Sequence, residues 1–465
     1  MRTSTLTGLL GLLLLLGTAC TTARSQTAPP PDAPPTAGFF TDRILPLLQT
    51  RFAPLLQNEP GLSLASWESL MAGSEHGAVV IPFDPENSLL LQLATKLPAD
   101  HPLRPHADAL TADEIALVRQ WIADGARNDD GEVPFADATN LAYVASQDGA
   151  RVWVIDMDRQ LQIRTIDLQA LGFSANAKPH HVAVEPDGTH WYVSLIAENK
   201  VLQFDRENRL VGQVDFERPG LLALDPARDT LYVGRSMAAV NPPQRIGIIT
   251  RSTLDIEEVG VFFPRPHALA VDSRRNVVYS ASLAENSIAT VDMTTGDVEL
   301  HRLDGPVHTL VQFALSPDGN TLIATGQMTG KLLIFDASNP PELPLLASLD
   351  VGAEPWHPVF SPDGRFAYFA NKRDNNVAVV DVPNREVVAH IEGPGLAEPH
   401  GAALSPDGRY LFVSSNNLKG GYTPRYPFVD TPAPGTVTVI DTATRAIVRV
   451  LEIGPYGSGM GTAAR

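Results

Sequence analysis

Five of the twelve histidines in this 465-residue chain recur at one place in a repeated segment, shortly before a turn related to Pro-Asp-Gly. His180, His267 and His400 lie five residues before the turn, and His181 and His357 lie four residues before it. Imidazoles bind copper, iron and zinc well, so imidazoles converging from several repeats could hold a metal ion or a haem iron. Because side chains alternate between the two faces of a strand, only the three at a shared offset are expected to share a face. The sequence therefore indicates His180, His267 and His400 as candidate metal ligands.

A second interpretation of the same histidines needs no ligand. Prolines accompany most of them, as at Pro179, Pro266 and Pro399, so the histidine can be a regular part of the repeat. Such a side chain would bond a backbone carbonyl of the neighbouring repeat. No cofactor is expected under this interpretation, whereas haem or copper is expected under the first. The sequence leaves both open.

Other common catalytic motifs are missing from the chain. There is no Gly-rich phosphate loop and no Gly-x-Ser-x-Gly elbow. Cys20 is the only cysteine, and it lies at the end of an apolar N-terminal run. The net charge of −18 argues against a nucleic-acid partner. These observations lean away from an enzyme.

The elements that position the histidines are set by the repeat itself. The turn occurs as Ser316-Pro317-Asp318-Gly319 and in related forms, at intervals of 40 to 47 residues. Each interval holds four short β-rich runs separated by turn residues, which is typical of one blade of a β-propeller. The third run occurs seven times, but the first run before the turn occurs only six times. We therefore predict seven blades over residues 137–465, with the segment Ser458–Arg465 supplying the missing inner strand of the first blade.

These repeats resemble the YVTN family of bacterial β-propellers, whose propeller type is shared with haem-d-binding nitrite reductases. The resemblance covers the predicted propeller and implies its fold. It implies little about function, because one propeller scaffold hosts many unrelated activities. In nitrite and nitrous oxide reductases, propeller histidines lie at the cofactor, which agrees with the first interpretation of the five histidines.

Long loops are expected on the same face as these histidines, because the connection into an inner strand and the loop between the second and third strands share one side of a propeller. Two such loops are long, at 236–244 and 416–435. Loops of that length in a compact domain are commonly functional, although a variable surface insertion is the plain alternative. Beside the five histidines, the expected ligand face contains Arg235, Trp356, Tyr422, Arg425 and Tyr426.

A small helical domain is predicted over residues 38–130. Its last helix is marked by the pair Thr111 and Glu114, which forms a capping box, and it ends at Gly125. The opening Ile44-Leu45-Pro46 and the closing run 113–122 resemble the planctomycete-type cytochrome c domain. In that family a Cys-x-x-Cys-His motif attaches the haem at the end of the first helix. Here the matching place reads Phe52-Ala53-Pro54-Leu55-Leu56.

The replacement of this motif implies a degenerate haem site at Phe52, Leu55 and Leu56. These apolar side chains could fill part of the volume that a haem would occupy, and empty core volume is costly. We therefore expect a cytochrome c-like domain without haem, kept for structure or docking. The fold class is accordingly multidomain, an all-α unit followed by an all-β propeller.

The N-terminus resembles a bacterial lipoprotein signal. An apolar run from Leu9 to Leu16 is followed by Gly17-Thr18-Ala19-Cys20, so residues 1–19 are predicted to be removed and Cys20 to carry lipid. The Pro-rich segment 20–37 would then be a tether. Acyl chains at Cys20 would hold the protein to a membrane without spanning it, with the outer membrane favoured.

Three functional hypotheses follow. The leading one is a non-enzymatic binding or scaffold module of the cell envelope, taking an envelope protein or a small ligand at the propeller face. The alternative is a redox, metal or haem protein that uses the histidine cluster together with an electron-transfer partner. A propeller hydrolase or lactonase ranks last, because it would need a metal held by carboxylates with a nearby Asn or His.

Overall fold

A computed structural model describes residues 38–463 of the chain. All of these residues fall within one compact unit. The predicted signal at 1–19, the lipidation site Cys20 and the tether at 20–37 lie outside the described residues. None of the helices within 38–463 is long and apolar enough to cross a membrane.

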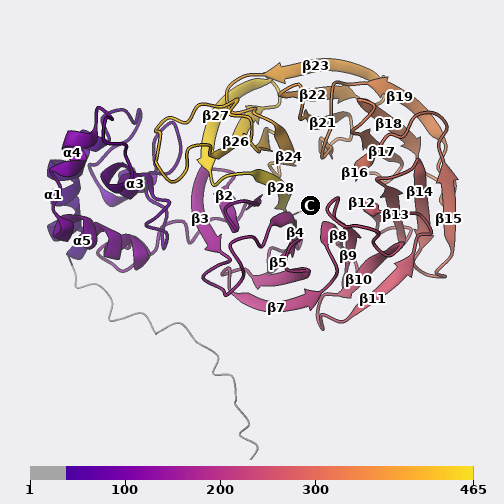
Figure 1. The fold of residues 1–465 in the computed structure, drawn as a ribbon, viewed down its shortest axis with the longest axis horizontal. Coiled ribbons are helices and arrows are strands. Elements are labelled where there is room, and N and C mark those ends of the chain that lie inside the picture. The colour runs from indigo at the N-terminus through magenta and orange to yellow at the C-terminus, as the bar shows by residue number, and fades with distance from the viewer. Residues whose placement is uncertain (1–37, 464–465) are drawn as a thin grey trace, which may run out of the picture. The chain divides into compact units, whose positions relative to one another are not determined.

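Seven four-stranded antiparallel sheets form a closed ring, as the repeat predicts (Figure 1). Figure 1 shows the first strands of the sheets gathered around the centre of the ring. Inner strands are buried along nearly their whole length because they pack between neighbouring blades; all six residues of β4 (Pro179–Val184) are buried. Outer strands such as β7 (Leu210–Asp215) alternate between more and less exposed positions.

The strands of each blade follow in order from the inner to the outer edge. Blade 1 contains β28 (Gly457–Thr462), β1 (Leu141–Ser146), β2 (Arg151–Asp156) and β3 (Leu161–Asp167). Blade 2 contains β4, β5 (His190–Leu195), β6 (Lys200–Asp205) and β7. Blade 3 contains β8 (Pro219–Asp225), β9 (Thr230–Arg235), β10 (Arg245–Thr250) and β11 (Ile256–Gly260). Blade 4 contains β12 (Pro266–Asp272), β13 (Val277–Ser282), β14 (Ser287–Asp292) and β15 (Val298–Arg302).

The remaining three blades have the same order. Blade 5 contains β16 (Leu310–Leu315), β17 (Thr321–Gly326), β18 (Lys331–Asp336) and β19 (Leu345–Asp350). Blade 6 contains β20 (Val359–Phe360), β21 (Phe366–Asn371), β22 (Asn376–Asp381) and β23 (Glu386–Glu392). Blade 7 contains β24 (Pro399–Leu404), β25 (Tyr410–Ser415), β26 (Gly435–Asp441) and β27 (Ala446–Ile453).

The ring closes through the C-terminal strand, which confirms the prediction from the strand count. β28 pairs antiparallel with β1, with Tyr143 opposite Gly461 and Val144 opposite Met460. Glycine is required along this strand because a Cβ at Gly459 would lie 2.3 Å from the carbonyl oxygen of His180. The closing strand β28 therefore packs directly against the neighbouring inner strand β4.

The helical unit (residues 38–130) consists of short helices. An opening helical segment contains η1 (Phe40–Ile44), α1 (Leu45–Leu47), η2 (Leu48–Phe52) and η3 (Ala53–Leu55). It is followed by α2 (Trp67–Met71), α3 (Leu89–Thr95), α4 (Arg104–Asp108) and α5 (Ala112–Ala123). The predicted capping box is present at α5, where the Thr111 and Glu114 side chains each accept the other's backbone N–H. Gly125 follows this helix with a φ of +101°.

The core of the helical unit is apolar where the resemblance places a haem-attachment motif. Phe52, Leu55 and Leu56 are all buried in one cluster with the leucines of α3. Tyr426 and Phe428, which belong to the long loop between β25 and β26, are buried in this same cluster. The helical unit thus completes its core with two side chains from blade 7.

Candidate functional site at the mouth of the channel

The five repeated histidines lie where inner strands begin. Residues 180 and 181 are in β4, His267 is in β12 and His400 is in β24. His357 lies two residues before the short strand β20. Because the inner strands line the channel and enter it from the same side, these positions form a ring around one opening, which we call the histidine mouth. All five side chains are buried, with between 0 and 8% of their surface exposed.

The imidazoles of the histidine mouth contact one another in a chain. Ring centroids are 6.3 Å apart for His180 and His267, and 6.0 Å apart for His180 and His400. They are 4.8 Å apart for His357 and His400, and 5.6 Å apart for His181 and His357. All five histidines are therefore brought together, and not only the three that share an offset.

The prediction that two histidines point to the opposite face is wrong, and the reason is a backbone irregularity. The pairing register shifts between Pro179 and Val182 in β4, between Pro266 and Ala268 in β12, and between Pro399 and Ala402 in β24. A β-bulge inserts a residue and re-aims the neighbouring side chains, so the two-residue alternation does not hold there. The bulges lie at the histidines themselves.

Hydrogen bonds fix some of the ring nitrogens and leave others without partners. Nδ1–H of His267 donates to the carbonyl oxygen of Arg235 at 2.6 Å, so its Nε2 carries the lone pair. The backbone N–H of Leu222 donates to Nδ1 of His181 at 3.3 Å. Within the histidine mouth, four buried ring nitrogens have no hydrogen-bond partner among residues 38–463: Nε2 of His180, His267 and His357, and Nδ1 of His400.

Burial keeps these imidazoles neutral. It lowers the pKa of His181 and of His267 to about 4, and repulsion from His267 adds to the effect at His181. The pKa values of His180, His357 and His400 are lowered well below the ordinary range by the same burial, with further repulsion from other histidines and from Lys372. At neutral pH the rings of the histidine mouth are therefore uncharged, and the unpartnered Nε2 of His267 carries a lone pair.

Two residues of the histidine mouth escaped the sequence analysis. The amide of Gln147 lies 2.9 Å from Nδ1 of His180, and Nζ of Lys372 lies 5.2 Å from the ring centroid of Trp356. Burial lowers the pKa of Lys372, with partial compensation from Glu398. Gln147 and Lys372 both directly follow the second strand of their blade, β1 and β21. The residue after the second strand of a blade lies on the same face as the histidines. This shared position could have identified Gln147 and Lys372 from the sequence.

Trp356 lies where the sequence predicted it and Arg235 acts through its backbone. The Trp356 ring centroid is 4.3 Å from that of His400. The guanidinium of Arg235 is buried against Phe216 and donates to Glu258 at 2.6 Å, so it does not face the channel. Its carbonyl oxygen orients His267 instead.

Tyr422, Arg425 and Tyr426 do not join the histidine mouth, contrary to the prediction. Nη1 of Arg425 lies 2.9 Å and the hydroxyl of Tyr426 lies 2.8 Å from the carboxylate of Glu59 in the helical unit. The Tyr422 hydroxyl donates to Glu452 at 2.8 Å. The long loop of blade 7 thus holds the helical unit. A partner 366 residues away in the chain could not be identified from local sequence.

The histidine mouth is not a preformed cage for an ion. Within residues 38–463, no three His, Cys, Asp or Glu side chains are placed together so that they could hold a metal ion. The histidines meet in pairs. A pair of imidazoles leaves other coordination positions to solvent or to a second ligand.

The chain is similar to propellers of the lactonase type. A family model described as "Lactonase, 7-bladed beta-propeller" matches residues 211–418. A 6-phosphogluconolactonase of Yersinia pestis is 22% identical over 304 residues, which cover 58% of this chain and 86% of that protein. A dihydro-heme d1 dehydrogenase of Pseudomonas aeruginosa is 34% identical over 108 residues, which cover 23% of this chain and 17% of that protein.

Solved structures agree on the fold. A putative 6-phosphogluconolactonase from Bacteroides fragilis superposes with a TM-score of 0.53 at 12% identity, covering 71% of this chain and all of that one. A protein from Desulfotomaculum acetoxidans superposes with a TM-score of 0.52 at 14% identity, covering 68% of this chain and all of that one. These likenesses show the seven-bladed propeller and nothing finer.

Proposed function

We propose that this protein is a ligand-binding module of the cell envelope and that its histidine mouth binds a transition-metal ion. One observation carries the proposal: four buried imidazole nitrogens of the histidine mouth have no hydrogen-bond partner among the described residues. Leaving a polar atom buried and unpaired costs about 1–3 kcal/mol. The histidine mouth has four such atoms close together. Binding a metal ion, which accepts nitrogen lone pairs, would offset this cost.

The spacing of the rings supports an ion more than a macrocycle. Two imidazoles bound to one ion at about 2.0–2.1 Å have ring centroids roughly 4.5–6.3 Å apart, depending on the angle at the metal. The adjacent pairs of the histidine mouth span 4.8 to 6.3 Å. Two imidazoles on opposite sides of a haem iron would lie at the upper end of this range, whereas the 4.8 Å between His357 and His400 requires a bent arrangement at a single ion. Copper is favoured among divalent ions because imidazole sites bind it most strongly.

The fit is best at His180, His267 and His400. His267 already has its Nε2 lone pair free, because its Nδ1–H is bound to the Arg235 carbonyl. Gln147 can offer either end of its amide to His180, so His180 can adopt the tautomer that frees its Nε2. The neutral state of the rings at pH 7 is the ligating state.

Metal binding to the whole protein tests this proposal. The protein is stripped with a chelator and titrated with Cu²⁺ and with Zn²⁺, and bound metal and its coordination are measured by calorimetry and electron paramagnetic resonance. One equivalent with nitrogen hyperfine structure is expected. A protein carrying both His180→Phe and His400→Leu should lose at least 100-fold in affinity, whereas the His190→Ala control on blade 2 should not. Absence of binding, or binding that survives the double substitution, contradicts the proposal.

Lactone hydrolysis is the second candidate, because the family model and the Yersinia relative are both named for it. The geometry supports it less. A general base works best with a pKa near the working pH, whereas burial lowers the pKa of His181 and His267 to about 4. No carboxylate orients any of the five histidines among the hydrogen bonds of residues 38–463. Hydrolysis of 6-phosphogluconolactone above the spontaneous rate, lost in His181→Asn, would favour this candidate instead.

The envelope location rests on Cys20, and the haem-free state of the helical unit rests on Phe52 and Leu55. We expect Cys20→Ser to release the protein from the membrane fraction. We expect no covalent haem stain at the mature mass on a denaturing gel. The apolar packing of Phe52 and Leu55 supports the second expectation, because both side chains are fully buried.

A further inference from the structure

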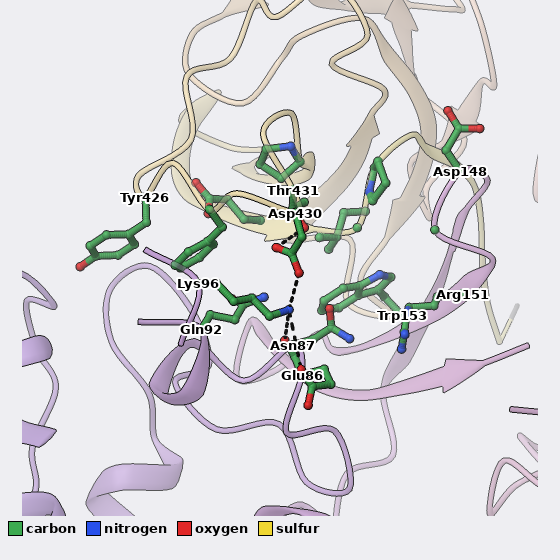
Figure 2. A pocket seen from close by; sticks show the side chains of 17 residues that line it. Glu86, Asn87, Gln92, Lys96, Asp148, Arg151, Trp153, Tyr426, Asp430 and Thr431 are labelled. Carbon is green, nitrogen blue, oxygen red and sulfur yellow. Dashed lines mark hydrogen bonds and ion pairs between the residues drawn. The ribbon is translucent and has the colours of Figure 1, made fainter. Parts of the chain in front are cut away.

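A cavity lies between the helical unit and blades 1 and 7, and none of the five histidines lines it. It has a volume of about 290 Å³. Its walls come from the start of α3 and the loop before it, from the β1–β2 turn, from the long loop of blade 7 and from the end of β27 (Figure 2). This volume is at the lower end of the ~300–1,000 Å³ typical of small-molecule sites, so it suits one compact ligand.

An unpartnered donor points to a ligand in this cavity. Trp153 is only 4% exposed, and its Nε1–H has no hydrogen-bond partner among the described residues. Figure 2 shows its ring between Lys96 and Arg151 in the cavity wall. A Cβ at Gly454, another lining residue, would lie 3.2 Å from this nitrogen, so the backbone at Gly454 packs closely against the indole. A buried indole N–H normally has an acceptor.

Every charged group of the cavity is already paired within the protein. Lys96 contacts Asp430 at 2.7 Å, as the dashed lines of Figure 2 show, and Arg151 contacts Asp167 at 2.8 Å. The carboxylate of Asp148 pairs with Lys178 at 2.7 Å. Glu86 pairs with Arg119, and Glu452 accepts the Tyr422 hydroxyl. A charged ligand would therefore find no free counter-ion, and an anion would also meet four carboxylates.

The hydrogen-bond acceptors and donors that remain free in the cavity walls are complementary to hydroxyl groups. Each paired carboxylate keeps further lone pairs that can accept from a hydroxyl. The side-chain amide of Gln92 makes no hydrogen bond with the described residues and adds a donor and an acceptor. Trp153, Tyr426 and Phe428 supply apolar surface. We infer that this cavity binds a neutral polyhydroxylated molecule of about the size of one sugar ring.

Three pyranoses that differ in charge test the inference: glucose, glucuronate and glucosamine. Binding to the full-length protein is measured by saturation-transfer NMR and calorimetry. Glucose is expected to bind at least 10-fold more tightly than either charged analogue. Trp153→Phe removes the donor but keeps the ring, and it should weaken glucose binding about 10-fold.

The matched control is Trp191→Phe in blade 2, whose Nε1–H already donates to Asn208. It should leave glucose affinity unchanged. Gln92→Leu is a second variant on an unrelated wall and should weaken binding at least threefold without altering thermal unfolding. The inference is overturned if none of the three sugars binds, if a charged analogue binds more tightly than glucose, or if both tryptophan variants behave alike.

Discussion

Two clusters of polar side chains are buried in this protein, and they differ in whether their members are paired. Glu59 is buried at the contact with blade 7, with a side-chain exposure of 1%, and its carboxylate meets Arg425, Tyr426 and Ser74. The histidine mouth is equally buried, yet four of its ring nitrogens have no partner within residues 38–463. The Glu59 carboxylate is bonded by three side chains and holds two parts of the structure together, although Nε of Arg425 has no hydrogen-bond partner among the described residues. The second leaves four ring nitrogens unpaired among the described residues, which is the observation behind the proposed metal site.

The comparison separates a structural role from a binding role. Donors and acceptors that satisfy one another contribute to stability, and breaking such a set exposes an unpaired group. Polar groups that are buried without partners reduce stability, so they persist where another function requires them. The same chemistry, imidazole or carboxylate, can serve either purpose. The hydrogen-bond partners of a buried group decide which role it has, and these partners can be identified only in the folded structure.

Opening the ring should have the largest effect and should act on the histidine mouth. In a chain ending at Gly457, β28 is lost, and with it the pairing to β1 and the contact of Ser458 with the carbonyl oxygen of His180. Loss of one buried strand removes several kcal/mol, so the melting temperature should fall by about 10 °C or more, or the protein should aggregate.

The control for this truncation is a chain ending at Ala463, which keeps all of β28. Differential scanning calorimetry compares the two with the full chain. Equal melting temperatures for all three chains would show that β28 adds nothing to ring stability.

The paired cluster should respond next most strongly. Glu59→Gln leaves Arg425, whose side chain is 21% exposed, without its counter-charge. Removing one partner of a buried ion pair costs about 3–5 kcal/mol, and the residual exposure of Arg425 places this substitution at the lower end. Urea unfolding of Glu59→Gln is compared with Glu68→Gln, an exposed position on α2. A change in the free energy of unfolding below 0.5 kcal/mol at Glu59, or one equal to that at Glu68, would contradict the paired interpretation.

The sequence predicted the fold more completely than the site. The turn repeat, the missing inner strand and the capping box at Thr111 each depend on local rules, and each is confirmed. The histidine mouth was predicted only in part, because bulges at Pro179, Pro266 and Pro399 break the alternation on which the offset argument depended. The role of Arg425 was mispredicted since its partner Glu59 is distant in sequence.

Lowering the pH should reduce the free energy of unfolding through the histidine mouth, with a smaller effect than the Glu59 substitution. The pKa of His267 is about 4 in the folded state, below the ordinary value of 6.5. Between those two pH values the unfolded chain binds more protons, so stability is full at pH 7 and falls as the pH is lowered. Each such histidine contributes on the order of 1.4 kcal/mol per pH unit within that window.

Urea unfolding at pH 7, 6 and 5 measures this slope. His267→Asn keeps a donor for the Arg235 carbonyl but cannot titrate, so it should flatten the dependence by the share of one histidine. His190→Asn on blade 2 is the matched control. A slope that His267→Asn leaves unchanged would mean that this imidazole is not held neutral by burial.

The smallest effect on stability is expected at His400, and it is the most informative one. Nδ1 of His400 is buried and unpartnered, and its ring lies against Trp356 and His357. Replacing an unsatisfied polar side chain by an apolar one of similar size removes a desolvation cost and keeps the packing. His400→Leu should therefore leave the free energy of unfolding within about 1 kcal/mol of the parent, or raise it, while abolishing metal binding. Urea unfolding and metal titration of the same sample measure both quantities. A loss of more than 2 kcal/mol would place His400 with Glu59 among the structural groups, and the histidine mouth would then be a part of the fold instead of a site.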